Sequence, residues 1–95
     1  MIKRIVKLEI KPNKVDEFKQ FFEKNKSQII SFDGCESVTL LQDVNDNCTF
    51  FTNSLWKSEN HLNSYRNSEF FNSVWSKVKL LFNNKPIAWS LFEIL

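Results

Sequence analysis

The sequence predicts an α+β fold in which antiparallel strands and helical regions follow the order βαββαβ. Three observations lead to this prediction. Apolar residues alternate with polar ones over residues 2–10, and two strand-like stretches flank a turn between residues 36 and 56. Apolar residues recur at helical spacing over residues 15–29 and 62–82. The chain has 95 residues and no linker or repeat, so we expect a single domain, residues 1–95.

The first strand carries one charged residue on its apolar face. That face holds Ile2, Val6, Leu8 and Ile10. Arg4 lies among them, and a buried guanidinium needs an anion or carbonyl groups around it. Pro12-Asn13 then turns the chain into the first helix, and Gly34 is expected to end this helix as a C-cap.

A hairpin is predicted next, with strands at residues 36–43 and 48–56 and a turn at 44–47. In the register that centres the turn on Asn45-Asp46, Cys35 lies on the order of 26 Å from Cys48. A disulfide needs Cα atoms closer than about 7 Å. We therefore expect two free thiols.

The same register pairs Asp43 with Cys48 and Cys35 with Trp56, and it distributes large apolar residues over both faces of the hairpin. One face holds Val38, Leu40, Phe51, Asn53 and Leu55. The other face holds Thr39, Leu41, Phe50, Thr52 and Trp56. One layer of helices covers only one face of a sheet, so the second face indicates a partner subunit.

The second helical region has two start signals and precedes the last strand. Ser58 is a good N-cap, and Ser68 can start a new helix after a break near Asn67. Its apolar stripe contains Leu62, Tyr65, Phe71, Val74, Trp75, Val78, Leu81 and Phe82. Residues 87–95 form the fourth strand, after Pro86. The arrangement is ferredoxin-like, with an antiparallel four-stranded sheet and helices on one face.

Composition excludes several classes of function. One Gly cannot supply a Rossmann fingerprint or a P-loop. The net charge of +2 comes from interleaved Lys and acidic residues, so no nucleic-acid partner is expected. Two separated Cys and one His do not have the spacing of a metal site, so no metal is expected. No apolar run approaches the roughly 20 residues of a membrane span, and Met1-Ile2-Lys3-Arg4 enters a strand without a signal peptide. We expect a cytoplasmic protein.

Four polar residues are candidates for catalysis, each with a structural alternative. His61 is the only imidazole and could serve as a general base, or it could face solvent at the start of its helix. Tyr65 could contact a phenolic ligand or make one structural hydrogen bond. Asn53, on an apolar face, needs a partner, a water or a ligand. Arg4 either pairs with a carboxylate or holds an anionic oxygen of the substrate. The carboxylates considered for Arg4 are Glu36, Glu69 and Glu93.

Aromatic residues are the candidates for substrate binding. They are Trp56, Trp75, Trp89 and Phe51. Indole and phenyl rings could line an apolar cleft for a flat aromatic substrate, or they could form an ordinary core. The chain has ten Phe and three Trp, enough for an aromatic core and for an aromatic cleft, so the composition does not decide between the two interpretations.

Four passages together resemble the antibiotic biosynthesis monooxygenase family. They are IKRIVKLEIKP, SFDGCESVTLLQD, FFTNSLWKSENHLNSYRNSEFF and KPIAWSLFEI, and they extend over nearly the whole chain. The third passage contains a Trp-x-Ser-x-x-x-Leu core at Trp56, Ser58 and Leu62. The resemblance implies a dimeric α+β barrel, and hence a homodimer.

The resemblance also implies alternatives for function. Some members oxygenate polyphenolic substrates without a cofactor, and others degrade haem. The residues that haem-degrading relatives use fall here on Val6, Tyr65 and Trp75, and none of the three matches. We therefore expect no cofactor and a cofactor-independent monooxygenase for a small aromatic or quinol-like compound. The alternative is a non-catalytic ligand-binding or stress-related dimeric barrel.

Overall fold

The computed structural model describes all residues, 1–95, and its elements follow the predicted order. The second helical region is divided in two, and two short 3₁₀ helices are added. The elements are β1 (Ile2–Glu9), η1 (Pro12–Lys14), α1 (Val15–Ile30), β2 (Cys35–Gln42), β3 (Thr49–Trp56), α2 (Glu59–Arg66), α3 (Glu69–Val78), η2 (Lys79–Leu81) and β4 (Ile87–Leu91).

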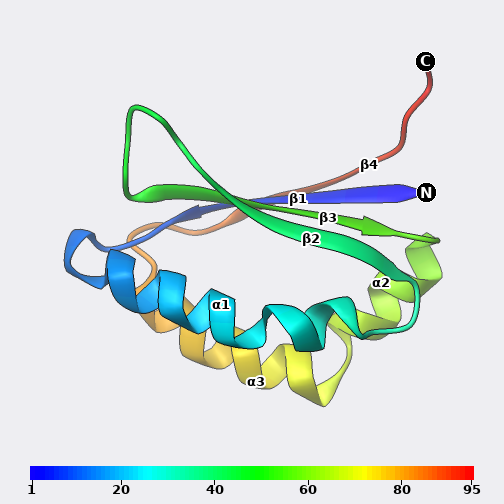
Figure 1. The fold of residues 1–95 in the computed structure, drawn as a ribbon, viewed down its shortest axis with the longest axis horizontal. Helices are drawn as coiled ribbons and strands as arrows, with labels where there is room; N and C mark the ends of the chain where they lie inside the picture. The colour runs from blue at the N-terminus through cyan, green and yellow to red at the C-terminus, as the bar shows by residue number, and fades with distance from the viewer.

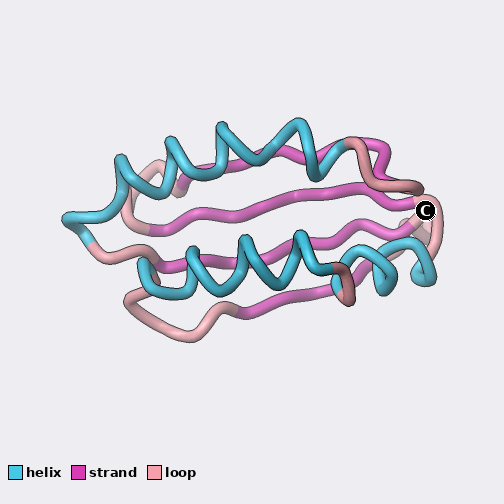
Figure 2. Tube along the Cα trace, turned by 90° about the horizontal axis from the view of Figure 1, so that it is seen from below, coloured by secondary structure: helices cyan, strands magenta, loops and turns pink.

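The four strands form one antiparallel sheet in the order β2-β3-β1-β4. All helices lie on one face of this sheet (Figure 1). Seen through the helical layer, α1 forms one row and α3 with α2 forms a second row beside it (Figure 2). The predicted ferredoxin-like α+β fold is confirmed. The helix-covered side of the sheet is called the inner face below, and the opposite side the outer face.

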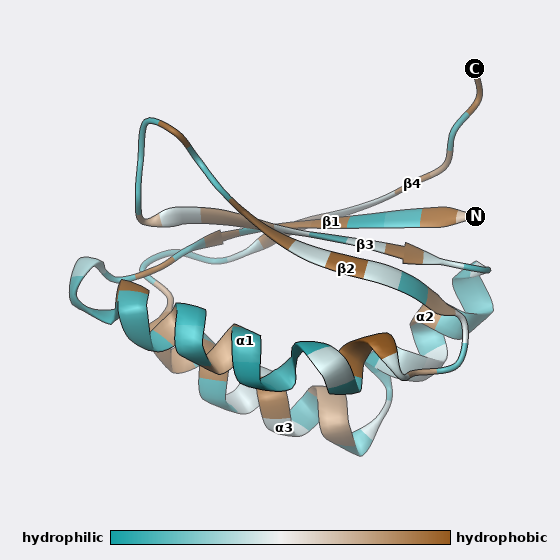
Figure 3. Cartoon of the chain, viewed as in Figure 1, coloured by the Kyte–Doolittle hydropathy of each residue, from teal (hydrophilic) through white to brown (hydrophobic).

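The main core lies between the inner face and the helices. It consists of Leu8, Ile10, Val15, Phe18, Phe50, Val78 and Leu81. Residues of β1, α1, β3, α3 and η2 form it, and Leu40 of β2 packs against it. The buried Val38 of β2 and Leu62 of α2 lie outside this cluster. The solvent side of α1 is mainly hydrophilic, whereas hydrophobic and hydrophilic residues alternate along β2 (Figure 3). This is the pattern of a helix and a strand that each bury one side.

Two serines begin the helices of the second helical region, as predicted. The Ser58 hydroxyl accepts a hydrogen bond from the His61 backbone N–H at 3.3 Å. The Ser68 hydroxyl accepts one from the Phe71 backbone N–H at 3.0 Å. Each satisfies a donor that the first turn of a helix leaves free. The break between α2 and α3 therefore falls at Asn67, where the sequence predicts it.

The predicted C-cap at Gly34 is wrong. The helix ends at Ile30, and Ser31 is the C-cap with right-handed backbone angles. The Phe32 N–H donates to the Ile29 carbonyl, so the last turn closes without a left-handed residue. Gly34 instead supplies the left-handed conformation of the turn that leads into β2, with φ +87°.

The predicted hairpin register is wrong by one residue over most of its length. Val38 pairs with Ser54, not with Asn53, and Leu40 pairs with Thr52. The Asp46 carboxylate causes this shift, because it accepts hydrogen bonds from Cys48 N–H and from the Thr49 hydroxyl. These bonds keep Cys48 in the turn, so the ladder begins one residue later.

A β-bulge between Cys35 and Ser37 corrects the shift at the far end of the hairpin. Cys35 therefore does pair with Trp56, as predicted. Between the turn and the bulge, however, each β3 side chain lies on the opposite face, relative to β2, from the one that the sequence predicts. Thr52 and Trp56 lie with Val38 on the inner face, and Asn53 lies on the outer face. Cys35 and Cys48 are free thiols, as predicted.

The outer face of the sheet carries exposed hydrophobic side chains. They are Leu41, Ile87, Trp89 and Leu91, which are between 42% and 50% exposed. The prediction that both faces are apolar is thus confirmed. Strand β4 ends at Leu91, four residues before the predicted end at Leu95. None of the helices combines the length and the hydropathy needed to cross a bilayer.

Candidate functional site

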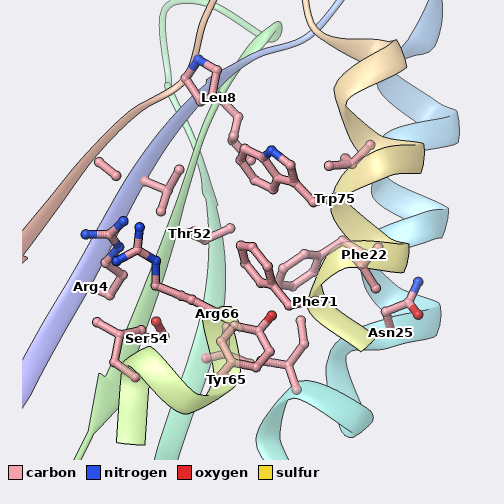
Figure 4. Close-up of a pocket in the computed structure, with 18 of the residues that line it drawn as sticks. Arg4, Leu8, Phe22, Asn25, Thr52, Ser54, Tyr65, Arg66, Phe71 and Trp75 are labelled. Carbon is pink, nitrogen blue, oxygen red and sulfur yellow. The ribbon is translucent and has the colours of Figure 1, made fainter. Parts of the chain in front are cut away.

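A cavity of about 190 Å³ lies between the helices and the inner face of the sheet (Figure 4). Of its 21 lining residues, 15 are hydrophobic, so the walls favour an apolar ligand. Its polar lining residues are Arg4, Asn25, Thr52, Ser54, Tyr65 and Arg66. A mostly apolar cavity with a few polar groups is the usual form of a small-molecule site.

Strand alternation determines which β1 residues reach the cavity. Arg4, Val6 and Leu8 line it, because every second residue of a strand points to the same face. Arg4 pairs with Ser54 across the sheet, and Val6 pairs with Thr52. The side of β1 that the sequence assigns to the core is therefore also the side that forms the cavity wall.

Four stacked or edge-on aromatic rings form a continuous wall of the cavity. Trp56 stacks on Tyr65 with ring centroids 5.0 Å apart. Tyr65 meets Phe71 edge-on at 5.1 Å, and Phe71 stacks on Trp75 at 5.7 Å. Trp56 is fully buried, and its indole N–H donates to the Ser54 hydroxyl at 2.9 Å. Of the predicted aromatic residues, Trp56 and Trp75 therefore line the cavity. The indole N–H of Trp56 is already bonded to Ser54 and is not free to bind a ligand.

Tyr65 contributes a hydroxyl donor to this wall. Burial, and secondarily the nearby Cys35 thiol, raises the pKa of Tyr65 to about 12. The phenol therefore stays protonated at neutral pH, and it cannot act as a general base there. No protein group hydrogen bonds to the hydroxyl, which is open to the cavity (Figure 4). It is available to donate to a ligand oxygen.

Arg4 lies at one end of the cavity and has no carboxylate partner. Its Nη1 donates to the Ser90 hydroxyl at 2.9 Å. The expected ion pair with a glutamate is absent, and Glu36 instead pairs with Lys57 at 3.9 Å. Burial, followed by the positive charge of Arg66, lowers the pKa of Arg4. The sequence could not reveal this, because it does not show which side chains surround the guanidinium.

Arg66 is a lining residue that the sequence analysis does not identify. It is the last residue of α2, where a basic side chain usually has a simpler interpretation as a partner of the helix dipole. In the structure its side chain extends toward Arg4 (Figure 4). The position of Arg66 four residues after Leu62 is the signal that could have found it, because residues i and i+4 lie on the same face of a helix.

Three sequence candidates lie on the outer face of the sheet, away from the cavity. Asn53 and Trp89 both pair with Ile5, and Phe51 pairs with Lys7. The shift in register places Asn53 and Phe51 there, since a shift of one residue reverses the face of every side chain. The main-chain carbonyl of Asn53 accepts a hydrogen bond from the Thr39 hydroxyl. These residues do not meet Arg4 and Tyr65.

His61 also lies outside the lining of the cavity. Its Nδ1 is 2.7 Å from the Ser58 hydroxyl, and its Nε2 is 3.6 Å from Oδ2 of Asp33. Its ring packs against Gly34. The imidazole therefore connects the start of α2 to the turn that precedes β2. His61 and Tyr65 do not share a polar edge of the cavity.

The remaining titratable residues do not form a second centre. No three side chains among His, Cys, Asp and Glu gather closely enough to hold a metal ion. Burial raises the pKa of the Cys35 thiol, although a backbone hydrogen bond with Ser37 opposes the rise. A protonated thiol is a poor nucleophile. The cavity is thus the place where polar and apolar groups converge.

The fold and the cavity define a class of protein, a small ferredoxin-like domain with an apolar site between sheet and helices. The family model of the antibiotic biosynthesis monooxygenases matches residues 1–74. The chain belongs to this family. The matched range includes β1 to β3, α2 and most of α3, and therefore most residues that line the cavity.

Solved structures share the fold at low sequence identity. A protein from Nitrosomonas europaea, provisionally named an antibiotic biosynthesis monooxygenase, has 18% identity and a TM-score of 0.91, with each chain covered completely. A structure named antibiotic biosynthesis monooxygenase has 17% identity and a TM-score of 0.92, again over both complete chains. A conserved protein from Methanosarcina mazei has 19% identity and a TM-score of 0.89, over 95% of this chain and 89% of the other. A comparison with functionally curated proteins finds no match.

Proposed function

We propose that this protein is a cofactor-independent monooxygenase that acts on a small aromatic or quinol-like compound. The observation that carries the proposal is the composition of the cavity. A wall of aromatic rings faces a space of about 190 Å³, and a protonated phenol and two guanidinium groups border it. Membership of the monooxygenase family supports the same conclusion.

The chemistry needs no electron carrier, because the substrate itself supplies the electrons. A phenolic substrate loses its proton, and its electron-rich ring passes an electron to dioxygen. The resulting radicals combine at a ring CH2 or CH carbon. For a ring CH2, one oxygen atom then becomes a carbonyl oxygen and the other leaves as water with the two hydrogens. The ring is oxidised, dioxygen is reduced, and all atoms and electrons balance.

The cavity residues have separate roles in this scheme. Arg4 and Arg66 favour the deprotonated substrate, because nearby positive charge lowers the pKa of an acid. Tyr65 donates a hydrogen bond to the oxygen on which negative charge develops. Neither Tyr65 nor His61 serves as the base, since the first is protonated and the second lies outside the cavity. The substrate proton therefore leaves to solvent.

Oxygen consumption tests the proposal. Purified protein, with no added metal, is mixed in an oxygen electrode with a panel of naphthols, anthrones and hydroquinones, with and without a carboxylate on the ring. We expect consumption above the uncatalysed rate for at least one compound, with a quinone as product. Consumption no faster than the background for the whole panel would refute the monooxygenase. Tight binding of a panel member without consumption would instead assign the alternative, a non-catalytic ligand-binding barrel.

We also propose that two copies associate through their outer sheet faces. Leu41, Ile87, Trp89 and Leu91 are exposed there, and such a row of apolar groups is costly to leave in water. Pairing the outer faces would bury these side chains and would leave the cavity of each copy on the side away from the contact.

A further inference from the structure

Two arginines from distant parts of the chain meet at the edge of the cavity. Arg4 comes from β1 and Arg66 from the last turn of α2. Both line the cavity. In Figure 4 their guanidinium groups face one another at the side of the cavity that β1 borders. The fold therefore brings two fixed positive charges together.

No negative charge of the protein accompanies this pair. The four ion pairs of the chain involve Lys7, Lys14, Lys57 and His61, and neither arginine takes part. The one side-chain hydrogen bond of Arg4 goes to an uncharged hydroxyl, that of Ser90. Burial and the charge of Arg66 lower the pKa of Arg4, so its surroundings oppose its positive charge. An anion between the two groups would remove this cost.

We propose that the cavity takes an aromatic carboxylate, with the carboxylate held by Arg4 and Arg66 and the ring against Phe71 and Trp75. This inference rests on one part of the proposed function, namely that an aromatic compound binds in this cavity. A carboxylate is the anion that fits best, because the planar guanidinium fork matches its two oxygens. The apolar walls accept the ring to which it is attached.

The size of the cavity limits the ligand further. A dry cavity of about 150 Å³ in another protein holds benzene. Sites for drug-sized ligands are larger, about 300–1,000 Å³. At about 190 Å³, this cavity suits one ring or two fused rings. Arg66 is exposed, so a carboxylate held by the arginines would stay partly in solvent. The substrate class is therefore a hydroxylated benzoate or naphthoate.

A matched pair of probes tests the proposal by binding alone. Calorimetric titration of the full chain compares 3-hydroxy-2-naphthoate with 2-naphthol, which has the same two rings and hydroxyl but no carboxylate. We expect the carboxylate to bind at least tenfold more tightly at low salt. In Arg66→Gln this preference should fall below threefold, while the affinity for 2-naphthol changes less than twofold. Arg66→Lys should keep an intermediate preference, because it keeps the charge but loses the fork.

Lys24→Gln is the control, because it removes one positive charge from the exposed side of α1. It should keep the full preference. Equal affinity for the two probes, no binding of either at millimolar concentration, or an unchanged preference in Arg66→Gln would overturn the proposal. The two proposals fail separately. Carboxylate preference without oxygen consumption keeps this inference and refutes the monooxygenase, whereas consumption with 2-naphthol and no preference does the reverse.

Discussion

The ring of His61 occupies the space that a side chain at Gly34 would need. The same glycine has a φ of +87°, which other residues rarely adopt. Gly34→Ala should therefore destabilise the protein for two reasons. The left-handed backbone conformation should cost about 1–2 kcal/mol, and the overpacking of the new Cβ against the His61 ring about 1–3 kcal/mol. Chemical denaturation measures the sum.

A second variant separates the two causes. In a His61→Ala background the overpacking is relieved, so Gly34→Ala should cost only the backbone contribution. An equal cost in both backgrounds would show that the His61 ring does not limit position 34.

Removal of the Tyr65 hydroxyl should reduce activity and not stability. Loss of one donor to a developing oxyanion lowers kcat by about 10²–10³-fold. Since no protein group bonds to this hydroxyl, Tyr65→Phe should change the free energy of unfolding by no more than about 0.5 kcal/mol. Oxygen uptake and thermal melting measure the two effects. Ser73→Ala, on the exposed side of α3, is the matched loss of a hydroxyl and should leave both unchanged.

The raised pKa of Tyr65 predicts a loss of stability at high pH. The folded phenol titrates at about 12 and the unfolded one near 10, so the folded state binds more protons between these values. The contribution of Tyr65 to the free energy of unfolding is fully present below pH 10. It is lost as the pH rises toward 12, and the loss is on the order of 2–3 kcal/mol. Tyr65 is the only tyrosine, so tyrosinate absorbance reports it directly. A tyrosinate signal that rises fully near pH 10 in the folded protein would contradict the prediction.

The Ser58 N-cap of α2 should contribute measurably to the free energy of unfolding. Ser58→Ala removes the acceptor of the His61 N–H and should cost about 1 kcal/mol, within a range of about 0.5–2 kcal/mol. Ser64→Ala is the control, because Ser64 is exposed in the same helix and caps nothing. Urea denaturation of both variants gives the comparison. Equal effects would show that the cap does not stabilise α2.

Association through the outer faces should depend on Trp89. Sedimentation is expected to give a dimer at micromolar concentration, and Trp89→Glu should shift it to a monomer by placing a charge among apolar groups. Val44→Glu makes a similar change in the exposed turn between β2 and β3 and should remain dimeric. A wild-type monomer at this concentration would refute the proposal.

The sequence predicts the fold more completely than the site, for physical reasons. Alternation, helical spacing and the caps at Ser58 and Ser68 are local signals, and they yield the order of elements. The register of the hairpin depends on which turn residues the Asp46 carboxylate binds, Cys48 N–H and the Thr49 hydroxyl, and a turn centred on Asn45-Asp46 does not specify them. The predicted register therefore places Asn53 on the wrong face of the sheet. The neighbours of Arg4 are non-local, since Ser90 and Arg66 are far away in the chain.

The β-bulge beside Cys35 affects how related chains are to be aligned with this one. Glu36 is the additional residue, so Cys35 and Val38 lie on the same side of the sheet although their numbers differ by three. A relative that lacks one residue here would have continuous alternation. An alignment without a gap at this point would then set Cys35, and every residue of the turn back to the end of α1, one position out of step.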